Sequence, residues 1–266
     1  MAIKHDQNFD DLSQRFRKNI YNTPKGQIRL NILWRDLDEE IPAIEQGGLK
    51  ILDAGAGQGH FALQLAEKKH HLTLCDLSIK MLQDAQTQFS EKGLVTDVHF
   101  IHTPVQELHE HIEEQYDIVL FHAVLEWLAE PKATLKYLLQ FIKPGGYLSL
   151  MFYSRTGLIY QNLTHGNFDL ILNNELAGEG KTLTPTNPQD PTDVEHWLNE
   201  AGLEIKIKSG VRVFYDGIRR ERRKEISENI LYELEKRYSR IEPYCSLARY
   251  IHILCQKPFD DNNKSK

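Results

Sequence analysis

The stretch Ile51-Leu-Asp-Ala-Gly-Ala-Gly-Gln-Gly59 is the part of the sequence that decides the fold. A short apolar run ends in Asp53, three glycines follow at alternate positions, and an apolar-periodic segment begins at Phe61. This pattern predicts a buried strand, a tight turn and the N-terminus of a helix. Glycine tolerates positive φ and lets a ligand lie against the backbone, and the N–H groups of the first helical turn face that ligand. We therefore expect a small nucleotide-like ligand at this turn.

Asp53 and the glycine spacing help to identify that ligand. The dinucleotide fingerprint G-x-G-x-x-G places a pyrophosphate on the helix N-terminus, whereas the spacing here is G-x-G-x-G. An acid two residues before the first glycine would repel a pyrophosphate but suits the ammonium group of S-adenosylmethionine. That cofactor also needs an acid after the next strand for its ribose hydroxyls, and Leu72-Thr-Leu-Cys-Asp76 supplies one. The glycine triplet alone would also be compatible with a simple turn.

Composition is typical of a soluble globular protein. The 266 residues are 41% hydrophobic and 26% charged, enough for one α/β domain with additions or for two small domains. No apolar run approaches the ~18–20 residues of a membrane span, and the first residues do not resemble a signal peptide. Three cysteines without metal-ligand spacing indicate a reducing compartment. We therefore expect a cytoplasmic protein without a metal or membrane partner.

Charge is distributed unevenly along the chain. The net charge is −6, yet the segment from Lys206 to Gln256 contains twelve Lys/Arg and seven Asp/Glu, which leaves −11 for the remainder. Such a segment is either a solvated face or a binding surface for phosphates, and the interleaved tyrosines would stack on unpaired bases. Within it, a basic cluster consists of Arg212, Arg219, Arg220, Arg222, Arg223 and Lys224, and Arg240 and Arg249 follow further on.

Strand-like and helix-like segments alternate in the first part of the chain. Apolar runs ending at Asp53 and Asp76, and the runs 98–102, 116–121 and 147–152, predict five strands. Helices are predicted at 79–92 and 131–141, and a turn at 143–146. This alternation indicates βαβ units and a parallel sheet.

The flanking segments supply additions to that sheet. Two helices, at 6–17 and 27–40, precede it and would cover the ligand as a lid. Arg29 on the second helix is either a ligand of the cofactor carboxylate or a solvated arginine. After the fifth strand we predict an insertion, a helix capped by Thr192 or Asp193, strands at 203–208 and 211–214, a helix at 217–238 and a last strand at 249–255.

The predicted fold is therefore α/β: a Rossmann-like class I methyltransferase with a mostly parallel seven-stranded sheet, N-terminal lid helices and an insertion after the fifth strand. We expect one domain throughout residues 1–266. Within it, 1–47 form the lid helices, 48–152 the cofactor-binding core and 153–191 the substrate insertion. Residues 192–257 form the C-terminal half of the sheet with the basic helix, and 258–266 a disordered tail.

His122 follows the fourth predicted strand, at the edge of the sheet where ligands bind. It is a candidate general base, and alternatively it lines the cofactor pocket or positions the substrate. We favour the second interpretation, because a histidine at this place is common among methyltransferases of many chemistries. The residues by themselves thus indicate a methyltransferase, with RNA as one possible acceptor.

Motifs along the whole chain then narrow the family. They include Asn8-Phe-Asp-Asp, Lys25-Gly-Gln-Ile-Arg29, Leu52-Asp-Ala-Gly55, Leu74-Cys-Asp-Leu-Ser78, Leu120-Phe-His-Ala-Val-Leu-Glu-Trp127, Leu148-Ser-Leu-Met-Phe-Tyr153, Gly166-Asn-Phe-Asp169, Gly210-Val-Arg-Val-Phe214, Glu242-Pro-Tyr244 and Arg249-Tyr-Ile-His252. With them the sequence resembles the bacterial tRNA 5-carboxymethoxyuridine methyltransferases over essentially its full length. Ala56 departs from the glycine that related sequences tend to have, and an alanine could not adopt positive φ cheaply.

This resemblance implies methyl transfer from S-adenosylmethionine to the carboxylate of 5-carboxymethoxyuridine at the tRNA wobble position, which gives a methyl ester. The partner would be the tRNA anticodon stem-loop, with the oligomeric state left open. The implied cofactor-binding residues are Arg29, Asp53, Gly55, Ala56, Gly57, Gly59, Asp76, Leu77, Pro104, Val105 and His122. The expected RNA-binding residues are Arg219, Arg220, Arg222, Arg223, Lys224 and Arg240.

The implied chemistry needs no general base, and the sequence contains no convincing catalytic triad. A carboxylic acid with a pKa near ~4 is already ionised at pH 7. Burying that carboxylate requires a cation or hydrogen-bond donors, and we expect Arg212 or Arg249 with the Tyr153 hydroxyl. Two alternatives stay open: a methyltransferase of a small carboxylic acid or quinone-type metabolite, and a non-catalytic S-adenosylmethionine-binding partner protein.

Overall fold

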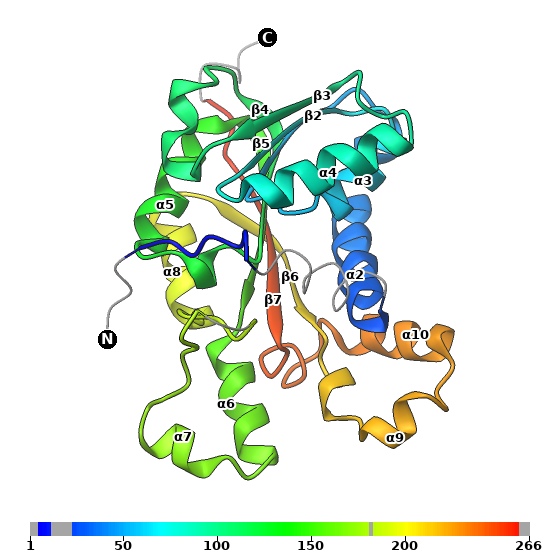
Figure 1. Cartoon of the computed structure of the whole chain (residues 1–266), viewed down its shortest axis with the longest axis vertical. Coiled ribbons are helices and arrows are strands. Elements are labelled where there is room, and N and C mark those ends of the chain that lie inside the picture. The colour runs from blue at the N-terminus through cyan, green and yellow to red at the C-terminus, as the bar shows by residue number, and fades with distance from the viewer. Residues whose placement is uncertain (1–4, 12–22, 181–182, 261–266) are drawn as a thin grey trace.

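The computed structural model describes residues 5–11, 23–180 and 183–260, and a seven-stranded sheet forms its centre (Figure 1). The strand order is β3-β2-β1-β4-β5-β7-β6, in which β1 to β5 are parallel and β7 runs antiparallel to both β5 and β6. The strands are β1 (Lys50–Ala54), β2 (His71–Asp76), β3 (Val98–His102), β4 (Tyr116–His122), β5 (Ile142–Tyr153), β6 (Glu204–Val211) and β7 (Tyr250–Gln256). The predicted Rossmann-like class I fold is confirmed.

Helices cover both faces of the sheet, so that two apolar cores form (Figure 1). One face is covered by α2 (Pro24–Glu40), α3 (His60–Glu67), α4 (Ile79–Glu91) and α10 (Glu228–Tyr238). The other is covered by α5 (Pro131–Leu138) and α8 (Pro191–Glu200), with the short turns η3 (Val105–Glu110) and η4 (Leu125–Trp127). Central strands buried on both faces are almost continuously apolar, as Ile118 to Phe121 in β4 show.

The N-terminal part differs from the prediction. Residues 5–11 contain no helix, and residues 12–17 lie outside the described residues. The helix predicted at 27–40 is present as α2 and begins earlier, at Pro24, because proline is well suited to the first helical position, where no backbone donor is needed. The expected tail is described only to Asp260.

Three predictions in the C-terminal half are wrong in detail. The helix expected at 217–238 is two helices, α9 (Arg220–Arg223) and α10, because Ser227 is extended. The strand expected at 211–214 does not form, because β6 ends where Arg212 adopts a φ of 63°. Asp190, rather than Thr192 or Asp193, caps α8 by accepting a hydrogen bond from the backbone N–H of Thr192 at 3.0 Å.

Two further differences concern β5 and the segment after it. The residues expected to form a turn at 143–146 belong to β5, opposite an irregularity in β4 between Tyr116 and Ile118. The segment 153–191 contains two helices that no periodicity indicated, α6 (Arg155–Thr164) and α7 (Phe168–Leu172). Figure 1 shows α6 and α7 beyond the lower end of the sheet, on the side opposite α9.

Candidate cofactor and acceptor site

A cavity opens at the edge of the sheet where the parallel strands end. It encloses about 1100 Å³, its open mouth included, and is bounded by the glycine turn after β1, the ends of β2 and β4, and α2. Of the residues predicted to bind the cofactor, those that line it are Arg29, Asp53, Gly55, Ala56, Gly57, Asp76, Leu77, Pro104, Val105 and His122. The structure thus brings together residues from five separate segments of the chain.

The glycine turn serves two different purposes. Gly57 has a φ of 56° and open space where a Cβ would lie, so a ligand can approach its backbone. Gly59, in contrast, is absent from the cavity wall, and a Cβ there would lie 3.1 Å from Leu74 and Phe89. Gly59 therefore allows α3 to pack closely on the sheet. Ala56 is not among the residues with positive φ, so its alanine is accommodated without strain.

Two buried carboxyl groups lie on this turn. The Asp53 side chain is 6% exposed, and burial together with the charge of Asp76 raises its pKa to about 7. Burial also raises the pKa of Asp76, although this carboxylate accepts hydrogen bonds from the backbone N–H groups of Gly57 and Ser78, each at 2.7 Å. A cation beside Asp53 would therefore be strongly stabilised. This environment fits the ammonium group of S-adenosylmethionine, with Asp76 placed for the ribose.

Residues 6–9 run across the mouth of the cavity as an irregular segment. The backbone N–H of Gln7 donates to the Trp127 carbonyl at 3.0 Å, and the Phe9 and Trp127 rings meet edge to face at 4.9 Å. The Asp6 carboxylate accepts from the Ala129 N–H and from Gln106, each at 2.8 Å. A cover over the ligand was expected here as a helix. The motif Asn8-Phe-Asp-Asp was the only sequence signal for these contacts.

The surroundings of His122 argue against a role as general base. Its Nε2 lies 2.8 Å from Ser149 Oγ. Burial, His252 and Arg29 lower the pKa of His122 well below its usual value. A neutral imidazole of low basicity is a poor proton acceptor at pH 7, so the geometry favours a lining or positioning role.

Arg29 connects the cofactor cavity to a second polar site. Its guanidinium, 6% exposed, lies 4.6 Å from the centre of the Tyr250 ring. The Arg212 guanidinium lies 5.8 Å from the centre of the same ring. The Tyr153 ring packs against the Tyr250 ring, with 5.0 Å between the two ring centres. The Tyr250 ring therefore lies between Arg29, which lines the cavity, and the residues predicted to hold the acceptor.

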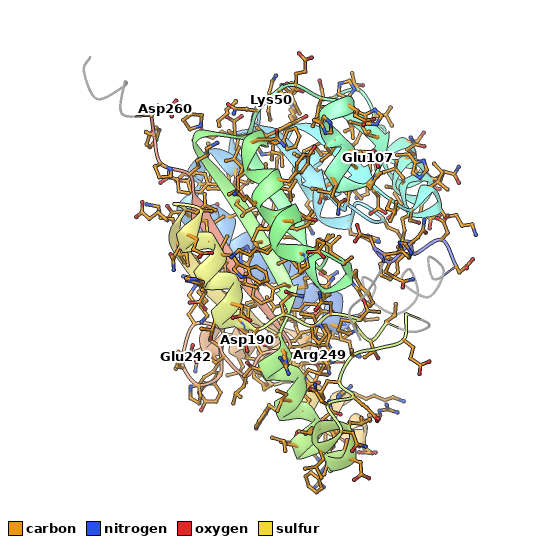
Figure 2. The ribbon with its side chains drawn as sticks, turned by 90° about the vertical axis from the view of Figure 1, so that its left-hand side faces the viewer. Lys50, Glu107, Asp190, Glu242, Arg249 and Asp260 are labelled. Carbon is orange, nitrogen blue, oxygen red and sulfur yellow. The ribbon has the colours of Figure 1, made fainter. Side chains whose placement is uncertain are left out.

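Two of those residues, Arg212 and Arg249, converge on Asp216. Together with Lys25 and Arg223 they form what we call the Asp216 cluster: Lys25, Arg212, Asp216, Arg223 and Arg249. Arg212 contacts both oxygens of the Asp216 carboxylate at 2.5 and 2.6 Å, and Arg249 donates to it at 2.7 Å. Arg249 also donates to Tyr153 and to Gln161 of α6, and Figure 2 shows it where β7 meets that helix. Arg223 donates to the Asp216 carbonyl at 2.9 Å.

Lys25 was not identified from the sequence as a site residue. It lies one helical turn before Arg29 on α2, so both side chains are on the same face. Burial and the charges of Arg212, Arg223 and Arg249 lower its pKa, although Asp216 opposes this effect. Positive charge thus exceeds negative charge around Lys25, which is the condition for holding an anion.

The residues predicted to bind RNA divide into two groups. Arg219, Arg220, Arg222 and Lys224 are exposed on and around α9. Arg223 is half-buried and, like Arg240, has partners within the protein, whereas Arg222 in the first group forms an exposed ion pair with Glu225 at 3.0 Å. Arg223 donates to backbone carbonyls and lies over the Tyr215 ring, and Arg240 pairs with Asp36 and Glu39.

Two features of the described part of the chain concern membranes and metals. None of its helices is long and apolar enough to cross a bilayer. Within the same ranges, no group of three or more His, Cys, Asp or Glu side chains is arranged to hold a metal ion.

Comparison with known families concerns first the part of the chain around the glycine turn. The methyltransferase domain family matches residues 52–150, which hold the glycine turn, both acids and His122. Among solved structures, magnesium protoporphyrin IX methyltransferase from Synechocystis PCC 6803 with bound S-adenosylhomocysteine superimposes with a TM-score of 0.64. It covers 94% of this chain and 96% of that chain at 15% identity, a likeness that concerns the fold.

Curated relatives narrow the family further. The ubiquinone biosynthesis O-methyltransferase of Acinetobacter baylyi is 27% identical over 69% of this chain and 73% of its own length. The tRNA 5-carboxymethoxyuridine methyltransferase of Escherichia coli K12 is 45% identical over 253 residues, which are 95% of this chain and 97% of the relative. The chain thus uses S-adenosylmethionine and belongs to the family of tRNA 5-carboxymethoxyuridine methyltransferases.

Proposed function

We propose that this protein methylates the carboxylate of 5-carboxymethoxyuridine at the wobble position of tRNA. Family membership supports the reaction, and one structural observation carries the assignment of the acceptor site. The Asp216 cluster, in which cations outnumber carboxylates, is joined through the Tyr250 ring to Arg29, which lines the cofactor cavity. An anionic acceptor held by that cluster would lie next to Arg29 and His122, where the methionine end of the cofactor belongs.

Cofactor binding falls to the residues around the glycine turn. Asp53 would stabilise the cofactor's ammonium group, Arg29 its carboxylate and Asp76 its ribose hydroxyls. Pro104 and Val105 would enclose the adenine, because both line the cavity beyond the end of β3. When bound, S-adenosylmethionine supplies an electrophilic methyl group on a sulfonium, which an ionised carboxylate attacks without the help of a base.

Arg212 is the residue of the Asp216 cluster that is most available to bind a further ligand. It is 9% exposed, and its Nε has no hydrogen-bond partner among the described residues. Its backbone is in the left-handed region at a φ of 63°, a strained conformation for a non-glycine residue and one that concentrates at functional sites. Arg212 and Lys25 would therefore contact the substrate carboxylate, with Arg249 and the Tyr153 hydroxyl beside them.

Asp216 limits how tightly the acceptor is held. Its carboxylate already engages Arg212 and Arg249. Nearby, Glu235 accepts hydrogen bonds from the backbone N–H groups of Val213 and Tyr215 at 2.8 Å. The cluster thus presents a partly neutralised positive charge to the acceptor. A modest contact suits this reaction, because a fully paired carboxylate would be a weak nucleophile. The alignment of the carboxylate with the methyl group and the exclusion of water then account for the acceleration. Well-oriented reactants lower the activation barrier by about 7–11 kcal/mol in this way.

Recognition of tRNA would use the exposed basic residues around α9. Arg219, Arg220, Arg222 and Lys224 would contact backbone phosphates of the anticodon stem-loop, and the wobble nucleotide would turn out of its stack to reach the cluster. Tyr153 and Tyr250 form the aromatic wall beside which that base would lie.

The experiment is methyl transfer to tRNA from a strain that lacks the enzyme, followed by mass spectrometry of the nucleosides. We expect the free 5-carboxymethoxyuridine to disappear as its methyl ester forms in equal amount. Methylation of a quinone or a small carboxylic acid in place of tRNA would assign the protein to small-molecule chemistry. Binding of S-adenosylmethionine without transfer to either substrate would indicate a cofactor-binding partner protein.

The same assay tests the acceptor site. Arg212→Met should lower kcat/KM for tRNA by roughly ten- to hundredfold, the value of a hydrogen bond to a charged group. The dissociation constant for S-adenosylhomocysteine should not change. Arg237→Met is the matched control, because Arg237 is an exposed arginine of α10 paired with Glu233, away from the cluster. Equal effects of the two substitutions would rule out this position for the acceptor.

A further inference from the structure

We propose that a buried chain of hydrogen bonds from Asp36 through His252 and Ser149 holds His122 with its proton on Nε2. His122 then presents the lone pair of Nδ1 to the cofactor cavity. In this arrangement Asp36, His252 and Ser149 are positioning residues that act through His122. The inference concerns the cofactor site alone and does not depend on which acceptor is methylated.

The distances form an uninterrupted path. Asp36 Oδ2 lies 2.7 Å from His252 Nδ1, and His252 Nε2 lies 2.9 Å from Ser149 Oγ. Ser149 Oγ lies 2.8 Å from His122 Nε2. Four elements contribute one residue each: α2, β7, β5 and β4. The path therefore runs from α2 over the adjacent strands β7, β5 and β4 to the cavity.

Burial makes each of these bonds obligatory. The side chains of Asp36, Ser149 and His252 are all 0% exposed. A buried polar group without a partner is costly, so each donor on the path must meet an acceptor. Once the donor and acceptor are fixed at one end of the path, the donor and acceptor of every other hydrogen bond on it follow.

Asp36 fixes that end. A carboxylate accepts only, so His252 Nδ1 must carry a proton. Arg35 and Arg240 contact Asp36 Oδ1 at 2.7 and 2.6 Å, and Arg240 also pairs with Glu39. A second proton on His252 would add another buried cation beside these two guanidinium groups, so we take Nε2 of His252 as the acceptor.

The remaining directions follow in order. Ser149 donates its hydroxyl proton to His252 Nε2, and its oxygen accepts from His122. His122 must therefore carry its proton on Nε2, which leaves Nδ1 unprotonated. His122 lines the cavity, and the described residues supply no hydrogen-bond partner for this Nδ1.

Only a hydrogen-bond donor can use that lone pair. Among the donors of S-adenosylmethionine, the ribose hydroxyls belong at Asp76 and the adenine at Pro104 and Val105, so the ammonium group is the donor for His122. The same chain keeps His122 uncharged. An imidazolium here would repel both the ammonium and the sulfonium.

Nitrogen-15 NMR of the full-length protein labelled at histidine tests the assignment without turnover. We expect His122 to give the pattern of a neutral imidazole protonated on Nε2, and His252 that of a neutral imidazole protonated on Nδ1. Loss of signals in His122→Asn and His252→Asn assigns the two rings. A His122 protonated on Nδ1, or a doubly protonated His252, would overturn the proposal.

Breaking the chain gives a second readout. Ser149→Ala should convert His122 into a mixture of tautomers and weaken S-adenosylhomocysteine binding by roughly two- to tenfold, the value of one hydrogen bond. Ser149→Cys should partly restore the single tautomer of His122 and the affinity for S-adenosylhomocysteine. Thr73→Val is the matched control, because it also removes a buried hydroxyl. The Thr73 hydroxyl is bonded to the Tyr116 hydroxyl at 3.1 Å and lies away from the cavity. Ser149→Ala with wild-type tautomers and wild-type affinity would refute the positioning role.

Discussion

At the scale of single residues, Asp53 shows how a ligand site destabilises its own protein. Its carboxyl group is buried beside Asp76, and no lysine or arginine pairs with it among the described residues. The folded state therefore disfavours the charged form, and binding of a cation reverses that cost. Sites of this kind are less stable empty than their packing would allow.

Asp53→Asn should accordingly separate stability from binding. The pKa of Asp53 is about 7 in the folded protein against an ordinary 3.8, so the folded state loses stability as pH rises from about 4 to 7. The variant should have a higher melting temperature than wild type at pH 8 and an equal one near pH 4, with about 2–4 °C gained per kcal/mol recovered. Its affinity for S-adenosylhomocysteine should fall. Calorimetry at both pH values measures the two effects, and a variant less stable at pH 8 would contradict this account.

The residues of the site differ in how far sequence could reveal them. Asp53 and Asp76 were predictable because each follows a strand directly, and strand ends of a parallel sheet share one edge. Lys25 and the contact between Arg29 and Tyr250 were not, since in each case the neighbours come from segments more than a hundred residues away. The sequence could not show that Gly59 lies outside the cavity wall, because glycines that admit a ligand and glycines that admit a packed side chain are alike in sequence.

At the scale of elements, the position of α6 would determine the geometry of the proposed acceptor site, because Gln161 of α6 contacts Arg249. The Cβ of any residue larger than glycine at position 157 would overlap the carbonyl oxygen of Ala248, directly before Arg249. Gly157→Ala should therefore displace α6 from the start of β7 and weaken the contact between Gln161 and Arg249. We expect kcat/KM for tRNA to fall at least tenfold, with cofactor affinity unchanged because α6 does not line the cofactor cavity.

Gly217→Ala is the control for that substitution. Gly217 has open space around its Cβ position and no left-handed φ, so an alanine there should leave methyl transfer close to wild type. A normal rate for Gly157→Ala would mean that α6 can shift without disturbing Arg249. Titration of both variants with S-adenosylhomocysteine, and circular dichroism to check folding, complete the comparison.

Elements were predictable where one local pattern decides them. The strands of the core followed from apolar runs, and α4 from its cap at Ser78, which accepts from the Met81 N–H at 3.2 Å. The break between α9 and α10 did not follow, because Lys224 to Ser227 has no proline or glycine and continues the helical period. Tertiary contacts override local preference there: Arg223 donates to two carbonyls of the preceding turn and so fixes α9 separately.

At the scale of the whole molecule, charge is arranged for a polyanion. The C-terminal segment 206–256 has an excess of +5 in a chain of net charge −6. The exposed arginines lie on and around α9, and this helix is placed beyond the lower end of the sheet, on the side opposite α6 and α7 (Figure 1). Such asymmetry orients a nucleic acid toward one end of the protein while the remaining surface repels it.

Reversing charge at α9 tests this arrangement. The triple variant Arg219→Glu, Arg220→Glu and Arg222→Glu should bind tRNA more weakly, and the slope of log K against log salt should flatten by about 2–3, since each lost phosphate contact contributes roughly 0.7–0.9. A matched triple variant, Lys50→Glu, Lys92→Glu and Lys132→Glu, changes net charge equally at exposed positions elsewhere. It should keep the wild-type slope, because counterions are released only where phosphates touch the protein. Equal losses in both variants would mean that net charge alone attracts tRNA, and that α9 has no special place in binding it.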